Sequence, residues 1–148
     1  MSDYKLKIEL IPEGCWGSNL RAILSKKQWD FLRSDAKIRS GGECSICGRK
    51  SNRLHAHERW SFDVDKKIQK LEDVIAVCPD CHSVIHIGRT QLVGNVERAE
   101  KHFMKVNACS YADFIRELGR ANEEHKARNT VSEWGLDLSW LKRFVKTD

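Results

Sequence analysis

Proline and glycine are scarce in this chain of 148 residues, which has two prolines and nine glycines. This scarcity excludes collagen-like and low-complexity classes. The chain also lacks an apolar run of the roughly 18 residues that a membrane-spanning helix needs. Its first residues, MSDYKLKIEL, carry charges where a secretory signal peptide would have an apolar stretch. We therefore expect a soluble, cytoplasmic protein with no membrane partner.

The composition is typical of a folded domain, with 41% hydrophobic and 32% charged residues. Because domains cluster around about 100–150 residues, we expect a single domain over 1–148. The net charge of +5 is compatible with a nucleic-acid partner. We divide the chain into an N-terminal strand and helical segment (1–42), a central segment rich in cysteine and histidine (43–90) and a C-terminal helical segment (91–148).

Two short strands and a helix are predicted in the central segment. Alternating polar and apolar residues predict a strand over 53–58, and the apolar run at 74–77 predicts a buried one. A helix is expected after Pro79, with Asp80 near its start. His82 and His86 share one face of that helix because they are four residues apart.

The flanking segments carry apolar residues at near-helical spacing, over 19–39 and again within 91–148. Gly41 and Gly42 end the first helical stretch, and Ser110 begins a helix in the second. The whole pattern predicts an α+β fold. The remaining aromatic, thiol and imidazole side chains are expected to be structural: Trp16, Trp29, Trp134 and Trp140 in the core, Cys15 and Cys109 as buried thiols, and His102 and His125 on helices.

Four cysteines form two C-x2-C pairs, Cys44 with Cys47 and Cys78 with Cys81. In a cytoplasmic chain such pairs indicate a metal site rather than disulfides. Thiolate sulfur suits zinc, and four protein ligands leave no open coordination position. We therefore expect a structural zinc that contributes free energy to folding.

Three histidines are candidates for a second metal site. His57 lies on the predicted first strand beside Glu58, and His82 directly follows the last cysteine of the zinc set. Once zinc joins the two cysteine pairs, this strand can face the helix that carries His82 and His86. Imidazoles and a carboxylate converging there could hold a divalent ion with open positions.

These residues resemble the motif of a known family. L-H-A-H-E-R-W at 54–60 and V-I-A-V-C-P-D-C-H-S-V-I-H at 74–86 resemble HNH endonucleases whose ββα-metal core is braced by a four-cysteine zinc. The resemblance covers about 43–90 and extends more weakly to W-G-S-N-L-R at 16–21, as in small prokaryotic and phage HNH proteins. It implies an α+β fold with a small ββα-metal (HNH, His-Me finger) core between N- and C-terminal helices. It also implies a metal-dependent DNA endonuclease.

The resemblance assigns roles position by position. His57 takes the metal position of the first strand, and Glu58 takes the general-base position, where the family has histidine. Asp73 stands where the family has its central asparagine. His82 matches the last histidine of the motif, and His86 is a further metal ligand or a phosphate contact. The catalytic ion implied is Mg2+ or Mn2+, with Ni2+ as a further candidate, besides the structural Zn2+.

Three identities of the general base stay open. Glu58 is the first, although a carboxylate with its ordinary pKa near about 4.3 is a weak base unless burial raises that pKa. His55, two residues before His57 on the same strand face, is the second. A register shift that makes His57 the base is the third, and it leaves Ala56 at the metal position.

The predicted partner is double-stranded DNA. Because one small domain has one active site, cleavage of both strands would require a homodimer or two successive nicks. Residues 59–72 are expected to form a loop between the strands that borders the site. Basic side chains there and on the helix could neutralise phosphates, although a solvated loop would look the same. The candidate DNA contacts are Arg59, Lys66, Lys67, Lys70 and Arg89.

A second class of function competes with the nuclease. Glu58 and Asp73 depart from the family pattern, and both departures weaken catalysis. The chain would then be a zinc-braced module, on an HNH scaffold, that binds nucleic acid or a protein partner without cutting. A binding module needs only the zinc, whereas a nuclease needs the second metal.

Overall fold

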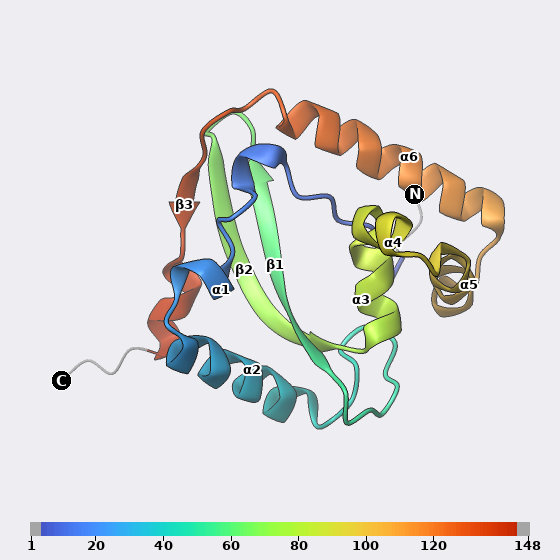
Figure 1. The fold of residues 1–148 in the computed structure, drawn as a ribbon, viewed down its shortest axis with the longest axis horizontal. Coiled ribbons are helices and arrows are strands. Elements are labelled where there is room, and N and C mark those ends of the chain that lie inside the picture. The colour runs from blue at the N-terminus through green and yellow to red at the C-terminus, as the bar shows by residue number, and fades with distance from the viewer. Residues whose placement is uncertain (1–3, 145–148) are drawn as a thin grey trace.

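The computed structural model describes residues 4–144, which form an α+β fold with a three-stranded sheet (Figure 1). The helices and strands follow in this order: a 3-10 helix at Glu13–Cys15, α1 (Leu20–Ile23), α2 (Lys26–Ser40), β1 (His55–Asp63), β2 (Ile68–Val77), α3 (Pro79–Ile85), α4 (Ile87–Val93), α5 (Val96–Asn107), α6 (Tyr111–Arg128), β3 (Gly135–Asp137) and a 3-10 helix at Ser139–Phe144.

The sheet has the order β1-β2-β3, so β1 is an edge strand. β1 and β2 pair antiparallel, and the short β3 runs parallel to β2. The predicted loop over 59–72 is wrong, because all of it except the turn at 64–67 belongs to the two strands. Charged residues on the solvent side of this hairpin weaken its apolar alternation, so the sequence pattern does not mark the full length of the two strands.

Helix α2 packs against the sheet along the lower edge of Figure 1. Ser25 and Gln28 form a capping box at its start. Gly41 ends it with a left-handed backbone, at φ 67°, which glycine adopts without steric cost. The predicted stop at this glycine is confirmed, and the helix buries Trp29 and Leu32 against the sheet side of the core.

The opposite side of the molecule is closed by α3 to α6 and by an extended N-terminal arm, residues 4–12. The arm forms no strand, but Glu9 N donates to Ile85 O at 2.9 Å and Asn107 bonds both backbone groups of Leu6. The capping box predicted at Ser110 is present. Each of these segments contributes large side chains that are fully buried, namely Leu6, Ile8, Val84, Ile87, Phe103 and Phe114, and β2 adds Leu71, Val74 and Val77.

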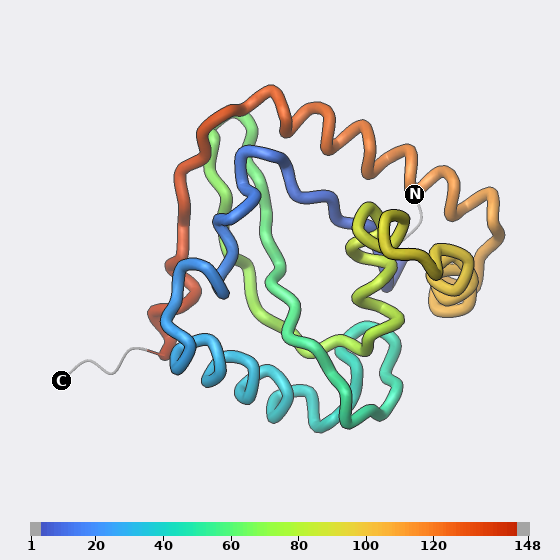
Figure 2. Tube along the Cα trace, viewed as in Figure 1, coloured from blue at the N-terminus to red at the C-terminus, as the bar shows by residue number. Residues whose placement is uncertain are grey.

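The C-terminal segment returns past β2 to α2, as the tube in Figure 2 shows. Its aromatic side chains dock as expected: Phe144 meets Phe31 edge to face, and Trp140 packs against the core. Trp29 is buried as predicted, but the core position predicted for Trp16 is wrong, since that side chain is 67% exposed. In residues 4–144, no helix has the length and apolar character to cross a bilayer.

Candidate metal centres

The four cysteines of the two C-x2-C pairs come together, with their sulfur atoms all within 4.8 Å of one another. Cys44 and Cys47 lie in the loop before β1, while Cys78 caps α3 and Cys81 lies in its first turn. Backbone amides point at the sulfurs in both pairs: Cys47 N lies 3.5 Å from Cys44 Sγ, and Cys81 N lies 3.4 Å from Cys78 Sγ. The loop and the helix start are therefore folded to present sulfur to a common point.

This four-cysteine group fits zinc. A tetrahedron with Zn–S bonds of about 2.3 Å places neighbouring sulfurs about 3.8 Å apart, and Cys47 Sγ and Cys78 Sγ are 3.8 Å apart. A hydrogen bond from Cys81 and three backbone amides outweigh burial and lower the pKa of Cys44 to about 4. The fold thus stabilises a thiolate at Cys44, the protonation state that a metal ligand needs, whereas burial raises the pKa of Cys78, and the hydrogen bond to Cys44 together with burial raises that of Cys81. A metal that binds the group would have to displace the protons of these two thiols.

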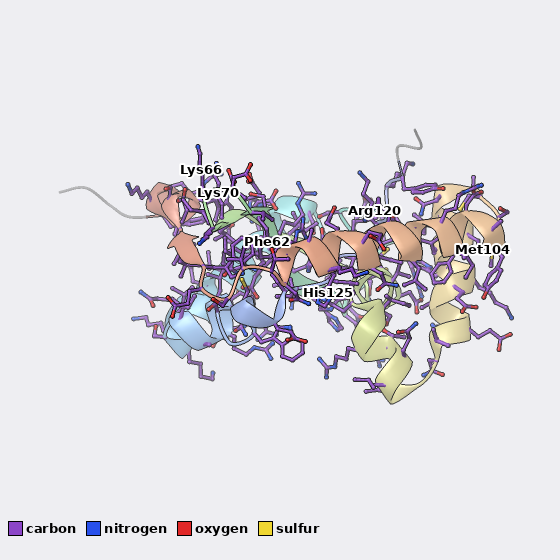
Figure 3. The ribbon with its side chains drawn as sticks, turned by 90° about the horizontal axis from the view of Figure 1, so that it is seen from above. Phe62, Lys66, Lys70, Met104, Arg120 and His125 are labelled. Atoms are coloured by element: carbon purple, nitrogen blue, oxygen red, sulfur yellow. The ribbon has the colours of Figure 1, made fainter. Side chains whose placement is uncertain are left out.

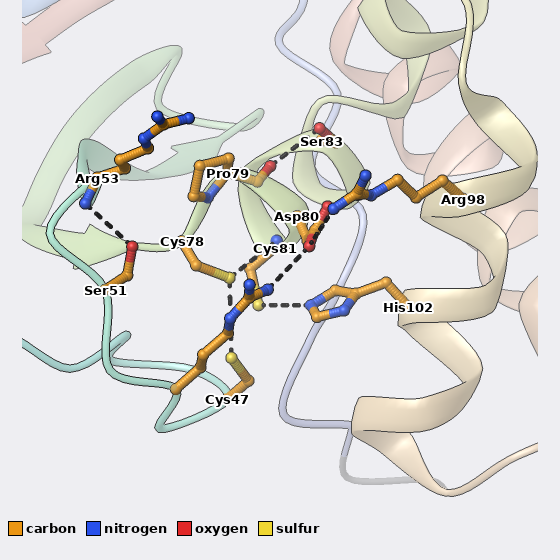
Figure 4. Close-up of polar contacts among 11 residues, drawn as sticks. Cys47, Ser51, Arg53, Cys78, Pro79, Asp80, Cys81, Ser83, Arg98 and His102 are labelled. Atoms are coloured by element: carbon orange, nitrogen blue, oxygen red, sulfur yellow. Dashed lines mark hydrogen bonds and ion pairs between the residues drawn. The ribbon is translucent and has the colours of Figure 1, made fainter.

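Two groups outside the C-x2-C pairs surround the cysteines (Figure 4). His102 of α5 places Nε2 3.1 Å from Cys81 Sγ. Asp80 pairs with Arg98 at 2.8 Å and with Arg49 at 3.1 Å, which ties α3 to α5 and to the cysteine loop. Nothing in the sequence marks His102 as a neighbour of Cys81, because α5 is brought there by packing alone.

A separate group of three histidines is the second candidate metal site. His57, His82 and His86 each place one ring nitrogen within 4.8 Å of the others. His57 comes from β1 and is 3% exposed. His82 lies on α3, and His86 is the residue between α3 and α4, one turn further on. The convergence predicted for these three side chains is therefore present, although His86 caps the helix instead of lying within it.

Burial keeps the imidazoles of His82 and His86 neutral. Together with the neighbouring imidazoles, it lowers the pKa of His82 to about 3 and that of His86 to about 4. Neutral rings offer their lone pairs to a metal at neutral pH. The group can therefore bind a metal without first having to release protons from these two side chains.

Two histidines of the group each have a further hydrogen-bond partner. Glu9 Oε2 lies 2.9 Å from His57 Nε2, and His55 Nδ1 lies 3.0 Å from His82 Nδ1. Hydrogen bonds of this kind fix the tautomer and the ring orientation of histidines that bind metals. Glu9 was not predicted from the sequence, since it is 48 residues from its partner and belongs to no motif.

The donor set decides which metal fits. Three imidazoles suit Zn2+ or Ni2+, whereas Mg2+ and Mn2+ prefer oxygen ligands such as carboxylates and water. Among residues 4–144, neither Glu58 nor Asp73 is a member of the histidine group. The Mg2+ or Mn2+ expected from the family resemblance is thus a poorer match to these side chains than the Ni2+ named as a further candidate.

Glu58 lies beside the histidine group. Its side chain lines one cavity of about 400 Å³ together with His57, His82 and His86. Its Oε1 accepts a hydrogen bond of 2.6 Å from Leu20 N at the start of α1. Burial raises its pKa, and this is the condition under which a carboxylate becomes a better base near neutral pH.

The remaining predicted site residues are distributed unevenly. Asp73 accepts a hydrogen bond of 2.9 Å from Arg59 across the hairpin, and both lie outside the lining of the cavity. Lys66 and Lys70 lie at the end of the molecule opposite Met104 of α5 (Figure 3). Of the five predicted DNA contacts, the cavity lining includes Arg89, and it adds Arg21 of α1, which the prediction missed.

Comparisons of the chain with models of protein families, with curated proteins and with solved structures found no match.

Proposed function

We propose that this protein is a metal-dependent DNA endonuclease of the HNH type. The observation that carries the proposal is the three-histidine group, which β1 and α3 form beside a four-cysteine group and at the wall of an open cavity. In this assignment β1, β2 and α3 are the ββα-metal core, and zinc on the four cysteines braces it. His57, His82 and His86 hold the second metal.

Hydrolysis of a phosphodiester needs a base for water, a cation at the phosphate and a fixed geometry. A divalent ion on the three imidazoles would supply a Lewis acid for the phosphate oxygens. Glu58 is the group that accepts a proton from water, with its pKa raised by burial and its carboxylate held by Leu20 N. The guanidinium groups of Arg21 and Arg89 neutralise the phosphates that enter the cavity.

The contacts favour Glu58 over the two alternative bases. His55 is bonded to His82, so its Nδ1 is engaged in orienting a ligand. His57 has Nε2 on Glu9 and belongs to the metal group, which leaves it no ring nitrogen for water. Asp73 braces the hairpin through Arg59, and we assign it no part in the chemistry.

Plasmid nicking by zinc-loaded protein tests the proposal, with Ni2+, Zn2+, Mn2+ or Mg2+ added in turn. Nicking should require the added metal and should be abolished in His82→Ala. Glu58→Gln should lower the rate by about 10²–10⁴-fold, the contribution typical of a general base. Glu72→Gln is the matched control, because this carboxylate is exposed and bonds only Ser61. Equal rates in the two glutamine variants would remove Glu58 from the mechanism.

The second candidate function is a zinc-braced module that binds nucleic acid or protein and does not cut. The observation that favours it is the Glu58 carboxylate, which already accepts a backbone hydrogen bond and lies outside the histidine group. A folded protein that retains zinc, binds DNA and nicks it with none of the four metals would establish this function instead.

A further inference from the structure

The N-terminal segment 15–21 forms the wall of the cavity that faces the histidines, and it carries one exposed indole. Trp16 is 67% exposed. Exposure of a tryptophan leaves a large apolar surface in water, so most tryptophans are largely buried. It borders the cavity that holds His57, His82 and His86, and it also borders a second hollow next to His86 and Arg89. Packing of the core therefore gives no reason for this side chain at this place.

The indole is held in position while its face stays open. Trp16 Nε1 donates to Ile11 O at 3.0 Å. The segment behind it is tied to both long strands: Gln69 of β2 donates to Ser18 O at 3.2 Å, and Glu58 of β1 accepts from Leu20 N. A fixed aromatic surface loses little conformational entropy when a ligand stacks on it.

The charges around the indole match a nucleotide chain. Arg21 and Arg89 line the same cavity, and the carboxylate that lines it with them, Glu58, accepts a hydrogen bond from Leu20 N. The cavity volume, about 400 Å³, lies in the range of small-ligand sites. An aromatic surface beside cationic groups is the combination with which proteins bind single-stranded nucleic acid.

We propose that Trp16 stacks on an unpaired base next to the phosphate bound at the histidines, so that the protein prefers single-stranded DNA or duplex ends with single-stranded extensions. This inference rests on the proposed function and narrows its substrate, which the family resemblance gave as double-stranded DNA. In a closed duplex the faces of each base are covered by its neighbours, so Trp16 could not reach one without unstacking it.

Fluorescence anisotropy with labelled DNA tests the proposal on zinc-loaded protein without a second metal, so that binding is measured apart from cutting. The same sequence is offered as a single strand, as a blunt duplex and as a duplex with a single-stranded extension. The single strand and the extended duplex should bind more tightly than the blunt duplex. Trp16→Ala should weaken their binding roughly ten-fold, within the range for one stacked base, and Trp16→Phe should recover most of it.

Tyr111→Ala is the control, because Tyr111 is a half-exposed aromatic residue at the start of α6 and lies outside the cavity lining. It should bind all three DNAs as wild type does, and circular dichroism should show every variant folded. If Trp16→Ala binds the single strand as tightly as wild type does, or if all three DNAs bind equally, the stacking assignment is wrong. A protein that shows the Trp16 effect but never nicks DNA retains this inference and loses the nuclease.

Discussion

Glu9 is the single residue on which the orientation of the histidine group depends most directly. Its carboxylate lies 2.9 Å from His57 Nε2, and its own amide donates to Ile85 O beside His86. A carboxylate hydrogen-bonded to Nε2 favours the tautomer that carries its proton there, which leaves Nδ1 with its lone pair. In the proposed metal site Glu9 would thus position His57 without being part of the motif.

Replacing Glu9 should therefore weaken the second metal site. We expect Glu9→Ala to lower the affinity of zinc-loaded protein for Ni2+ by about 10–100-fold, the usual effect of losing such a partner. Titration calorimetry measures the Ni2+ affinity. The affinity of Glu9→Gln should lie between those of wild type and Glu9→Ala, because glutamine keeps an acceptor oxygen without the charge. Glu13→Ala, an exposed carboxylate four residues on, is the control. Unchanged Ni2+ affinity in Glu9→Ala would show that His57 needs no help from it.

The buried imidazoles also make stability depend on pH in a defined direction. The pKa of His82 is lowered from 6.5 to about 3 and that of His86 from 6.5 to about 4. Below pH 6.5 the unfolded chain takes up protons at these rings while the folded chain does not, so acid favours unfolding. The contribution of these two neutral rings to the free energy of unfolding is complete above pH 6.5 and is lost progressively as the pH falls toward about 3.

Urea unfolding of zinc-loaded protein at pH 7 and at pH 5 measures this loss. The double variant with His82→Asn and His86→Asn should lose less unfolding free energy between the two values than wild type does. The cysteine group is common to both proteins, so zinc release cancels in the comparison. A double variant with the same pH dependence as wild type would mean that these rings are not buried as neutral groups.

At the scale of elements, α3 serves both metal groups at once. Cys78 and Cys81 lie at its start, while His82 and His86 lie on its body and at its end. The helix is only seven residues long, and isolated helices of this length are unstable in water. Its geometry therefore depends on its contacts with α5 and β1, and the zinc proposed at its first turn would add to them.

Removal of one zinc ligand should therefore lower the stability of the whole domain as well as its zinc binding. We expect Cys81→Ser to abolish stoichiometric zinc binding and to lower the melting temperature markedly, because the removed metal no longer anchors α3. Metal analysis and thermal melting followed by circular dichroism measure both effects. Cys109→Ser, which lies outside the four-cysteine group, should keep its zinc and its melting temperature. A Cys81→Ser protein that melts like Cys109→Ser would contradict a structural role for the metal.

Local spacing made the metal groups predictable, and distance along the chain made their surroundings unpredictable. Two residues between paired cysteines, and three between His82 and His86, fix geometry within one turn of chain. Glu9 and His102 reach their partners only through the folded arrangement of other segments. The hairpin was predicted too short for a different reason, since its charged outer face masks the alternation that marks a strand.

At the scale of the whole molecule, the flanking segments complete the site built by the centre. Glu9 and Arg21 come from the N-terminal side, and His102 comes from α5. The N-terminal arm is bonded to α5 and to α6. Ile8 N donates to the buried carboxylate of Glu117 on α6, and Leu6 N donates to Asn107 at the end of α5. The flanks are therefore part of the metal centres rather than separate attachments.

Cys81 and His82 are neighbours in the chain, yet one belongs to the sulfur group and the other to the imidazole group. If the four cysteines bind zinc as proposed, this adjacency couples the two groups, because any shift of Cys81 is passed directly to His82. We therefore expect oxidation of the thiols, or removal of zinc, to disturb the histidine group as well as the cysteine group.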